Sequence, residues 1–237
     1  MQAWMCESLD GVDALKWREL PTPEPQAGEV RVAIHAASLN FPDSLTIVGK
    51  YQFKPELPFV PGSEFSGRID ALGEGVTGLE VGDPVIGIAS SGGFATHACL
   101  PAARVLPLPP GVDLTDAAAF AFTYGTSHHA LLDRGQLQPG ETVLVLGAAG
   151  GVGTAAVQIA KAAGARVIAA ASSDAKCAFL KTLGADETIN YASGNLRDAL
   201  KTLTAGKGPD IVYDPVGGDL AEPAFRSIAW RGRYLVV

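Results

Sequence analysis

The sequence predicts two domains, an all-β domain over residues 1–123 and an α/β domain with a doubly wound parallel sheet over residues 124–237. Two observations predict this fold class. Short apolar runs separated by glycine and proline turns fill the first half of the chain, as in small β-sandwiches and barrels. In the second half, apolar strand-like runs alternate with segments of helical periodicity, which is typical of a parallel sheet covered on both faces.

The N-terminal strands follow from alternation and turn residues. Residues 29–35 alternate with period two, which places Val30, Val32 and Ile34 on one face. The following apolar runs are separated by Pro61-Gly62, Gly73-Glu-Gly75, Val81-Gly-Asp-Pro-Val85 and Gly92-Gly93. The alanine-rich segment from Thr115 to Leu132 predicts a partly helical connection between the domains.

The α/β domain starts with an unbroken apolar strand, residues 142–146, and a helix with apolar positions from Val152 to Ala163 that ends at Gly164. The later strands and helices alternate along the chain. The expected strands are 166–170, 187–190, 210–213 and 233–237, and the expected helices are 174–183, 196–203 and 219–228. A doubly wound sheet has the strand order 3-2-1-4-5-6, and five of these strands are present.

A glycine-rich turn joins the first of these strands to its helix. Its spacing, Ala148-x-Gly150-x-x-Gly153, is the dinucleotide-binding fingerprint with alanine in place of the first glycine. Such a turn lets an anion approach the free amide groups of the helix N-terminus. We therefore predict cofactor contacts from Ala148, Gly150, Gly151, Val152 and Gly153; the structural alternative is a tight turn with no ligand.

The end of the second strand indicates which dinucleotide is bound. An NAD site usually has Asp or Glu at this strand end, whereas this chain has Ser172, Ser173 and Lys176. Hydroxyl and ammonium groups can donate to a 2′-phosphate, so the sequence favours NADPH. The alternative is that Ser173 only caps the next helix and that Lys176 is a solvated surface charge.

The composition is that of a soluble cytoplasmic enzyme. Hydrophobic residues make up 47% of the chain, and 18 basic against 25 acidic residues give a net charge of -7 with no basic cluster, which argues against a nucleic-acid partner. We expect no signal peptide and no membrane span. The three cysteines, Cys6, Cys99 and Cys177, are too widely spaced for a disulfide framework or a Cys-x-x-Cys metal pair.

Several ordered motifs resemble a known family. The motifs are 39–43 (LNFPD), 61–64 (PGSE), 82–85 (GDPV) and 147–153 (GAAGGVG). Together they resemble the medium-chain dehydrogenase/reductase superfamily, and within it the zinc-free quinone oxidoreductases and their enone-reducing relatives. The resemblance implies a GroES-like β domain followed by a Rossmann domain.

The residues also bear on metal binding. Gly62-Ser63-Glu64 stands where zinc enzymes of this superfamily have Gly-His-Glu, and no cysteine occurs in residues 39–43 where a further ligand is expected. We therefore predict no metal. Hydride transfer without a metal favours a quinone or an α,β-unsaturated carbonyl as the small-molecule substrate, over an alcohol or a simple ketone.

The resemblance implies further site residues. Asn40 and Tyr51 are the candidate catalytic hydrogen-bond donors to the substrate. The structural alternatives are that Asn40 satisfies loop backbone groups and that Tyr51 packs at the domain boundary. The resemblance also implies cofactor contacts from Thr126 on the nicotinamide side, from Tyr191 on the adenosine side, and from Val216 after the fourth strand.

Other interpretations stay open at this level. A Rossmann methyltransferase leaves the β domain unexplained, and a nucleotide-binding redox sensor or structural protein without turnover is compatible with the motifs. The chain stops within the apolar run 234–237. From this we expect a fragment of a longer reductase that binds NADPH weakly as given, and a homodimer when the sixth strand is present.

Overall fold

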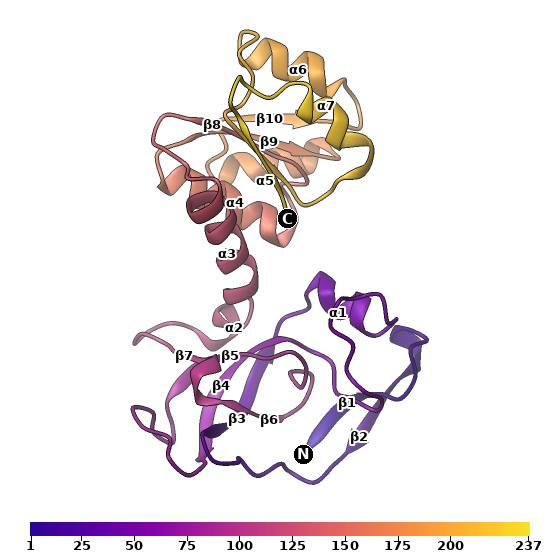
Figure 1. Cartoon of the computed structure of the whole chain (residues 1–237), viewed down its shortest axis with the longest axis vertical. Coiled ribbons are helices and arrows are strands. Elements are labelled where there is room, and N and C mark those ends of the chain that lie inside the picture. The colour runs from indigo at the N-terminus through magenta and orange to yellow at the C-terminus, as the bar shows by residue number, and fades with distance from the viewer. The chain divides into compact units, whose positions relative to one another are not determined.

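The computed structural model describes all 237 residues, which form two compact units, Met1–Phe122 and Thr123–Val237 (Figure 1). We call the first the β unit and the second the α/β unit. The division falls one residue before the boundary expected from the sequence, within helix α3 (Ala121–His128).

The β unit contains two antiparallel sheets. Strands β1 (Gln2–Cys6) and β2 (Leu15–Glu19) form a hairpin. A five-stranded sheet has the order β6-β3-β4-β5-β7. Its strands are β3 (Glu29–Ala37), β4 (Glu64–Leu72), β5 (Pro84–Ile88), β6 (His97–Pro101) and β7 (Val105–Pro107). The short helices are η1 (Val12–Ala14), α1 (Phe41–Thr46), η2 (Ala102–Arg104) and α2 (Leu114–Ala117).

The core of this sheet follows the alternation seen in the sequence. Val30 and Val32 are fully buried and pack with Phe65 and Ile69 of the neighbouring strand β4. Ile34, on the same face, is only partly buried. The period of two therefore predicts the buried face of β3 correctly.

The α/β unit has a five-stranded parallel sheet with the order β10-β9-β8-β11-β12. In chain order this is 3-2-1-4-5, as expected from the sequence. The strands are β8 (Thr142–Val145), β9 (Arg166–Ala171), β10 (Glu187–Asn190), β11 (Ile211–Asp214) and β12 (Arg233–Val236). The helical segments are α3, η3 (His129–Arg134), α4 (Gly151–Ala162), α5 (Asp174–Thr182), α6 (Leu196–Leu203), η4 (Gly218–Leu220) and α7 (Ala221–Phe225).

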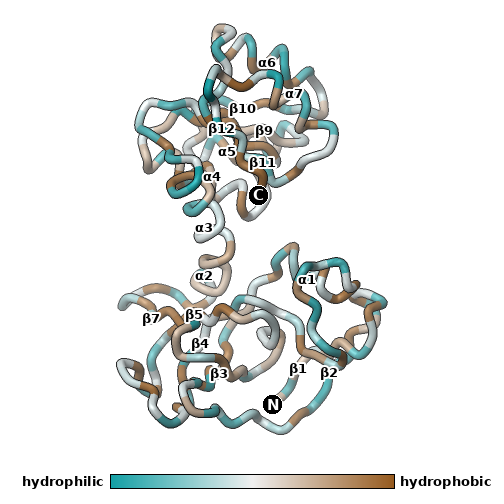
Figure 2. Tube along the Cα trace, viewed as in Figure 1, coloured by the Kyte–Doolittle hydropathy of each residue, from teal (hydrophilic) through white to brown (hydrophobic).

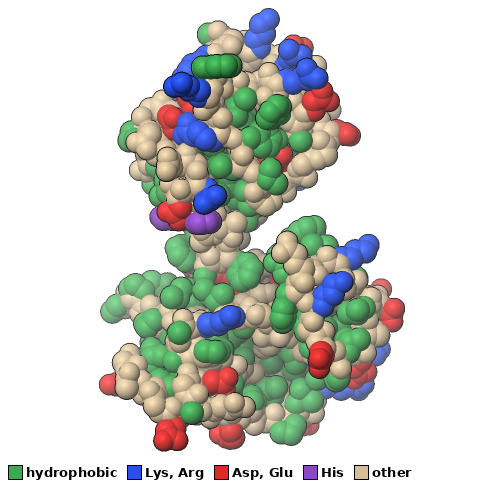
Figure 3. Space-filling view, in the orientation of Figure 1, with side chains coloured by type: hydrophobic (Ala, Val, Ile, Leu, Met, Phe, Trp, Pro, Cys, Tyr) green, Lys and Arg blue, Asp and Glu red, His purple; other side chains and the backbone are tan.

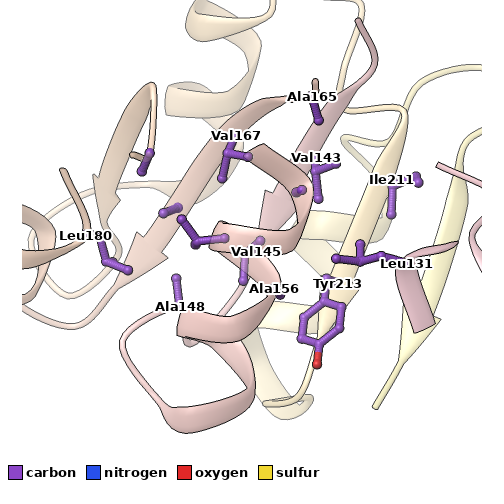
Figure 4. Close-up of a cluster of buried hydrophobic side chains, with 14 of the residues drawn as sticks. Leu131, Val143, Val145, Ala148, Ala156, Ala165, Val167, Leu180, Ile211 and Tyr213 are labelled. Carbon is purple, nitrogen blue, oxygen red and sulfur yellow. The ribbon is translucent and has the colours of Figure 1, made fainter. Parts of the chain in front are cut away.

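Successive residues of the central strands pack on opposite faces of the sheet. Val143 and Val145 of β8 contact the cluster that includes α4 and α5 residues such as Ala156 (Figure 4). Leu144 belongs to a second cluster with Leu200 of α6 and other residues of α6 and α7. Hydrophobic residues accordingly concentrate along the central strands (Figure 2). Both faces are covered, which explains why these strands are continuous apolar runs in the sequence.

One expected helix is wrong in its extent. The segment 219–228 divides into the 3-10 turn η4 and the short helix α7, which ends at Phe225. Pro223 has no N–H to donate, and this is tolerated in the first turn of a helix but not further along. The helix therefore begins at Ala221, so that Pro223 falls within its first turn.

No helix in the structure combines the length and the apolar character needed to cross a bilayer.

Candidate dinucleotide and substrate sites

The glycine turn leads from β8 into α4, and the amide groups at the start of this helix have no acceptor. The N–H groups of Gly151, Val152 and Gly153 make no hydrogen bond, and no side chain caps the helix. By contrast, side-chain oxygens of Asp113, Ser173 and Asn195 cap helices α2, α5 and α6. Helix α4 has 12 residues, so its uncapped end presents three donors and a partial positive charge.

Two glycines of the turn serve different purposes. A methyl group at Gly153 would lie 2.6 Å from the carbonyl oxygen of Gly147 and 2.7 Å from Ala148 atoms, so glycine is required for close packing of the helix on the turn. A methyl at Gly150 would meet nothing closer than 3.4 Å, and the φ of Gly150, -82°, suits any residue. The fold alone does not require glycine at position 150, whereas a ligand that approaches the backbone there does.

The predicted 2′-phosphate residues lie together at the carboxyl end of β9. The Lys176 ammonium donates to Ser172 Oγ at 3.1 Å, and Ser173 Oγ accepts the backbone N–H of Lys176 at 3.3 Å as the cap of α5. Asp174, the nearest carboxylate in the sequence, accepts from Asn190 at 2.7 Å. Ser173 thus has the capping role weighed as the alternative, and its hydroxyl proton stays available to a ligand.

Tyr191 and Val216 follow the next two strands at the same sheet edge. The backbone N–H of Tyr191 donates to Ala171, the last residue of β9, at 3.0 Å. The Val216 side chain packs against the glycine turn: a methyl group added at Gly147 would lie only 2.6 Å from Val216 Cγ2. The carboxyl ends of parallel strands meet at one edge, so the turn, the serines, Tyr191 and Val216 surround one region.

A buried carboxylate shapes the loop that carries Val216. Asp214 is 3% exposed and accepts from the N–H groups of Val216 and Gly217, both at 2.8 Å, and from the Tyr234 hydroxyl at 2.6 Å. Burial and the Asp214 carboxylate both raise the pKa of Tyr234, so its proton stays in place. Sequence reasoning missed this role of the Asp214 side chain.

Thr126 lies on α3 and lines a hollow of about 630 Å³ beside β12. The other lining residues are His129, Ala130, Arg134 and the segment 233–237. The Thr126 side chain is exposed and makes no hydrogen bond, so its hydroxyl is available to a ligand.

In the β unit, Asn40 belongs to a network around a fully buried carboxylate. Glu64 is 0% exposed, forms no ion pair, and accepts from the N–H of Phe122 at 2.9 Å and from the Ser38 hydroxyl at 2.7 Å. The Asn40 amide donates to Ser38 Oγ at 2.8 Å and to Glu64 at 3.3 Å. Asp43 accepts from the Asn40 N–H at 2.8 Å and from the Ser63 hydroxyl at 2.6 Å. Ser38 Oγ and Glu64 Oε2 lie only 2.7 Å from each other, so one amide proton of Asn40 is shared between them and the second has no partner in the protein.

Tyr51 lies in the irregular segment after α1, and its hydroxyl makes no hydrogen bond. Asn40, by contrast, lines an apolar groove of about 830 Å³ together with Trp4, Trp17 and Phe94. The two tryptophan rings meet edge to face at 5.2 Å. Hydrophobic side chains are exposed over much of the face of the β unit drawn in Figure 3. Tyr51 is not among the residues that line this groove.

Metal-ligating side chains do not cluster in either unit. No group of three or more His, Cys, Asp or Glu residues has a geometry that could hold an ion. Ser63, at the position compared above with a histidine ligand, donates to Asp43. The absence of a metal stays a prediction for elemental analysis.

Comparison with known proteins agrees with this architecture. The alcohol dehydrogenase GroES-like domain family matches residues 26–110, and the zinc-binding dehydrogenase family matches residues 151–237. A quinone oxidoreductase-like protein 2 homolog of Nematostella vectensis is 40% identical over 238 residues, which is 100% of this chain. The chain spans 65% of the length of that relative.

Solved structures match over both units. The quinone oxidoreductase of Thermus thermophilus, solved also with NADPH, is 38% identical with a TM-score of 0.86 over 99% of this chain and 72% of its own. An NAD-dependent alcohol dehydrogenase is 36% identical with a TM-score of 0.94 over 99% of this chain and 76% of its own. With these relatives, this fold and both family matches, the chain belongs to the medium-chain dehydrogenase/reductase superfamily and is similar to its quinone oxidoreductases.

Proposed function

We propose that the chain provides the coenzyme site and substrate-activating residues of an NADPH-dependent oxidoreductase that reduces a quinone or an α,β-unsaturated carbonyl without a metal. The observation that carries this proposal is the set of three uncapped N–H groups at the start of α4. They lie beside the point where the strand order reverses, between β8 and β11. The pyrophosphate of a dinucleotide would accept from these groups.

Coenzyme choice is the finer part of the proposal. Ser172 and Lys176 offer a hydroxyl and an ammonium group already 3.1 Å apart, and no carboxylate ends β9 to repel a 2′-phosphate. The NADPH complex of the Thermus thermophilus relative supports this choice, while the NAD-dependent relative shows that the fold serves both coenzymes. The residues at the strand end therefore carry the argument for NADPH.

The bound nicotinamide supplies the hydride, and the chain has to stabilise the negative charge that develops on the substrate oxygen. The Tyr51 hydroxyl has no partner within the protein, so we propose it as the donor to that oxygen. One proton of the Asn40 amide is held by Ser38 and Glu64, so the other is available as a second donor to a substrate in the groove that Asn40 lines. Tyr51→Phe and Asn40→Ser should therefore each lower kcat, because each removes a free donor.

Coenzyme titration tests the binding part. If Lys176 and Ser172 hold a 2′-phosphate, charge-assisted hydrogen bonds should favour NADPH over NADH by about ten- to a hundredfold. Lys176→Ala should remove most of that preference and leave NADH affinity unchanged. Lys201→Ala is the matched control, because Lys201 is an exposed lysine of α6 whose side chain makes no hydrogen bond or ion pair. Equal affinity of the parent for both coenzymes would overturn the choice of NADPH.

Turnover is measured as NADPH oxidation with a panel of quinones and enones. We expect oxidation with at least one acceptor class, and a loss in Tyr51→Phe. Coenzyme binding without oxidation by any acceptor would favour the alternative of a nucleotide-binding protein without turnover.

A further inference from the structure

Ser127 joins three elements of the α/β unit behind the glycine turn. Its side chain is 0% exposed on α3. Ser127 Oγ lies 2.8 Å from the carbonyl oxygen of Val152, in the first turn of α4, and 2.9 Å from the hydroxyl of Tyr213 on β11. Tyr213 is also fully buried, and its ring lies beside Leu131 with the hydroxyl directed away from the apolar cluster (Figure 4).

The two hydrogen bonds that join Tyr213, Ser127 and Val152 can have only one donor-to-acceptor order. A carbonyl oxygen only accepts, so the single hydroxyl proton of Ser127 is donated to Val152. Tyr213 must then donate its proton to Ser127 Oγ. Burial raises the pKa of the Tyr213 hydroxyl, which keeps this proton in place at ordinary pH. The order is therefore Tyr213 to Ser127 to Val152.

The carbonyl of Val152 belongs to the same peptide group as the N–H of Gly153. In a planar trans peptide these two groups point in opposite directions. A hydrogen bond that holds the carbonyl from inside therefore fixes the direction in which the Gly153 N–H points at the uncapped end of α4. A hydrogen bond to the carbonyl also polarises the peptide and strengthens its N–H as a donor.

We propose that Ser127 and Tyr213 are positioning residues for the pyrophosphate of the bound dinucleotide, acting through the peptide between Val152 and Gly153. This inference rests on the proposed dinucleotide site at α4. It predicts an effect shared by NADPH and NADH, because both carry the pyrophosphate, and so it differs from the effect of Lys176.

The test is the Kd of each coenzyme, and of inorganic pyrophosphate as a competitor, for the whole chain and its variants. Ser127→Ala should raise the Kd of all three by about five- to tenfold, the equivalent of one hydrogen bond, with the NADPH-to-NADH ratio unchanged. Tyr213→Phe keeps the ring and leaves Ser127 able to donate to Val152, so we expect about a two- to threefold rise. The double variant should match Ser127→Ala alone, because Tyr213 acts through Ser127.

Thr204→Val is the matched control for the loss of a buried hydroxyl. Thr204 donates to the Leu200 carbonyl at 2.7 Å and accepts the Gly208 N–H at 3.0 Å, near the amino end of β11. It should lower the melting temperature and leave every Kd unchanged.

Unchanged Kd values in a folded Ser127→Ala or Tyr213→Phe variant, with the parent still binding, would overturn the positioning role and leave the proposed function intact. A parent chain that binds neither coenzyme would overturn both. If Ser127→Ala fails to fold, the isosteric Tyr213→Phe decides the question.

Discussion

Two glycines three residues apart in the same turn should respond in opposite ways to the same added methyl group. In Gly153→Ala the methyl would lie 2.6 Å from the Gly147 carbonyl oxygen, about 0.8 Å inside the 3.4 Å at which ordinary contact begins. The atoms in the way are backbone, so the helix and the turn must separate. Overpacking of this kind costs about 1–3 kcal/mol. For a unit of this size that corresponds to a fall in melting temperature of roughly 4–12 °C.

In Gly150→Ala the methyl meets no protein atom closer than 3.4 Å. Alanine caps a helix less well than glycine, so we expect a loss of about 0.5 kcal/mol in stability. The methyl does occupy the space through which a pyrophosphate reaches the free N–H groups of α4. We therefore expect the Kd of NADPH to rise by about ten- to a hundredfold, or about 1.4–2.8 kcal/mol.

The two effects are separated by measuring thermal unfolding by circular dichroism and coenzyme affinity by nicotinamide fluorescence on the same preparations. Gly150→Ala should melt within about 2–4 °C of the unsubstituted protein and bind NADPH poorly. If it binds NADPH with the parent's affinity, the pyrophosphate does not approach this turn and the assignment of the site is wrong. If Gly153→Ala melts with the parent, the steric argument fails.

Three further predictions concern ionisation and metal content. Arg233 hydrogen-bonds Glu141 through both its terminal nitrogens and lowers the pKa of that carboxyl below 4.5, so the pair stabilises the fold above that pH and the contribution is lost as the pH falls through the lowered pKa. Glu141→Gln should therefore cost about 1–2 kcal/mol in urea unfolding at pH 7 and progressively less as the pH falls below 4.5; a loss that does not change with pH would contradict the reasoning. Burial raises the pKa of Cys99 to about 11, so its alkylation, followed by peptide mass mapping, should be slow at pH 8 and still accelerate above pH 9. Elemental analysis should find no stoichiometric zinc, and chelator should leave activity unchanged; one tightly bound zinc per chain would refute the interpretation of Ser63 as a lost ligand position.

The order of elements in the α/β unit could be predicted from the sequence because each signal is local. A continuous apolar run between turn residues gives β8, and Gly164, with φ of 81°, ends the helix as its position after Ala163 predicts. The strand predicted at 210–213 lies one residue later, at β11, since strand ends depend on partners distant in the chain. The helix predicted at 219–228 was too long, because the prediction relied on helical periodicity and gave too little weight to Pro223, which restricts where a helix can begin.

The side-chain networks could not be predicted, because their partners lie far apart in the chain. Glu64 accepts a hydrogen bond from the N–H of Phe122, 58 residues away, and Ser127 is hydrogen-bonded to Tyr213, 86 residues away. In the sequence, Ser127 is one polar residue beside Thr126 and two histidines, with no spacing that distinguishes it. A weak signal existed for Glu64, since Ser63, Glu64 and Ser66 interrupt an apolar strand, and buried polar groups need partners. The identity of those partners requires the fold.

In the proposed function, coenzyme affinity and coenzyme choice rest on physically different parts of the α/β unit. The N–H groups at the start of α4 are oriented by the helix before the ligand arrives, and the peptide that carries the Gly153 N–H is also held by the hydrogen bond from Ser127 to the Val152 carbonyl. Lys176 is exposed and held by a single hydrogen bond to Ser172, so its side chain loses conformational freedom when it pairs with a phosphate. Substitutions at the end of β9 can therefore change the preference between coenzymes without disturbing the pyrophosphate site. An NADPH complex and an NAD-dependent enzyme among relatives of the same fold are the outcome that this separation permits.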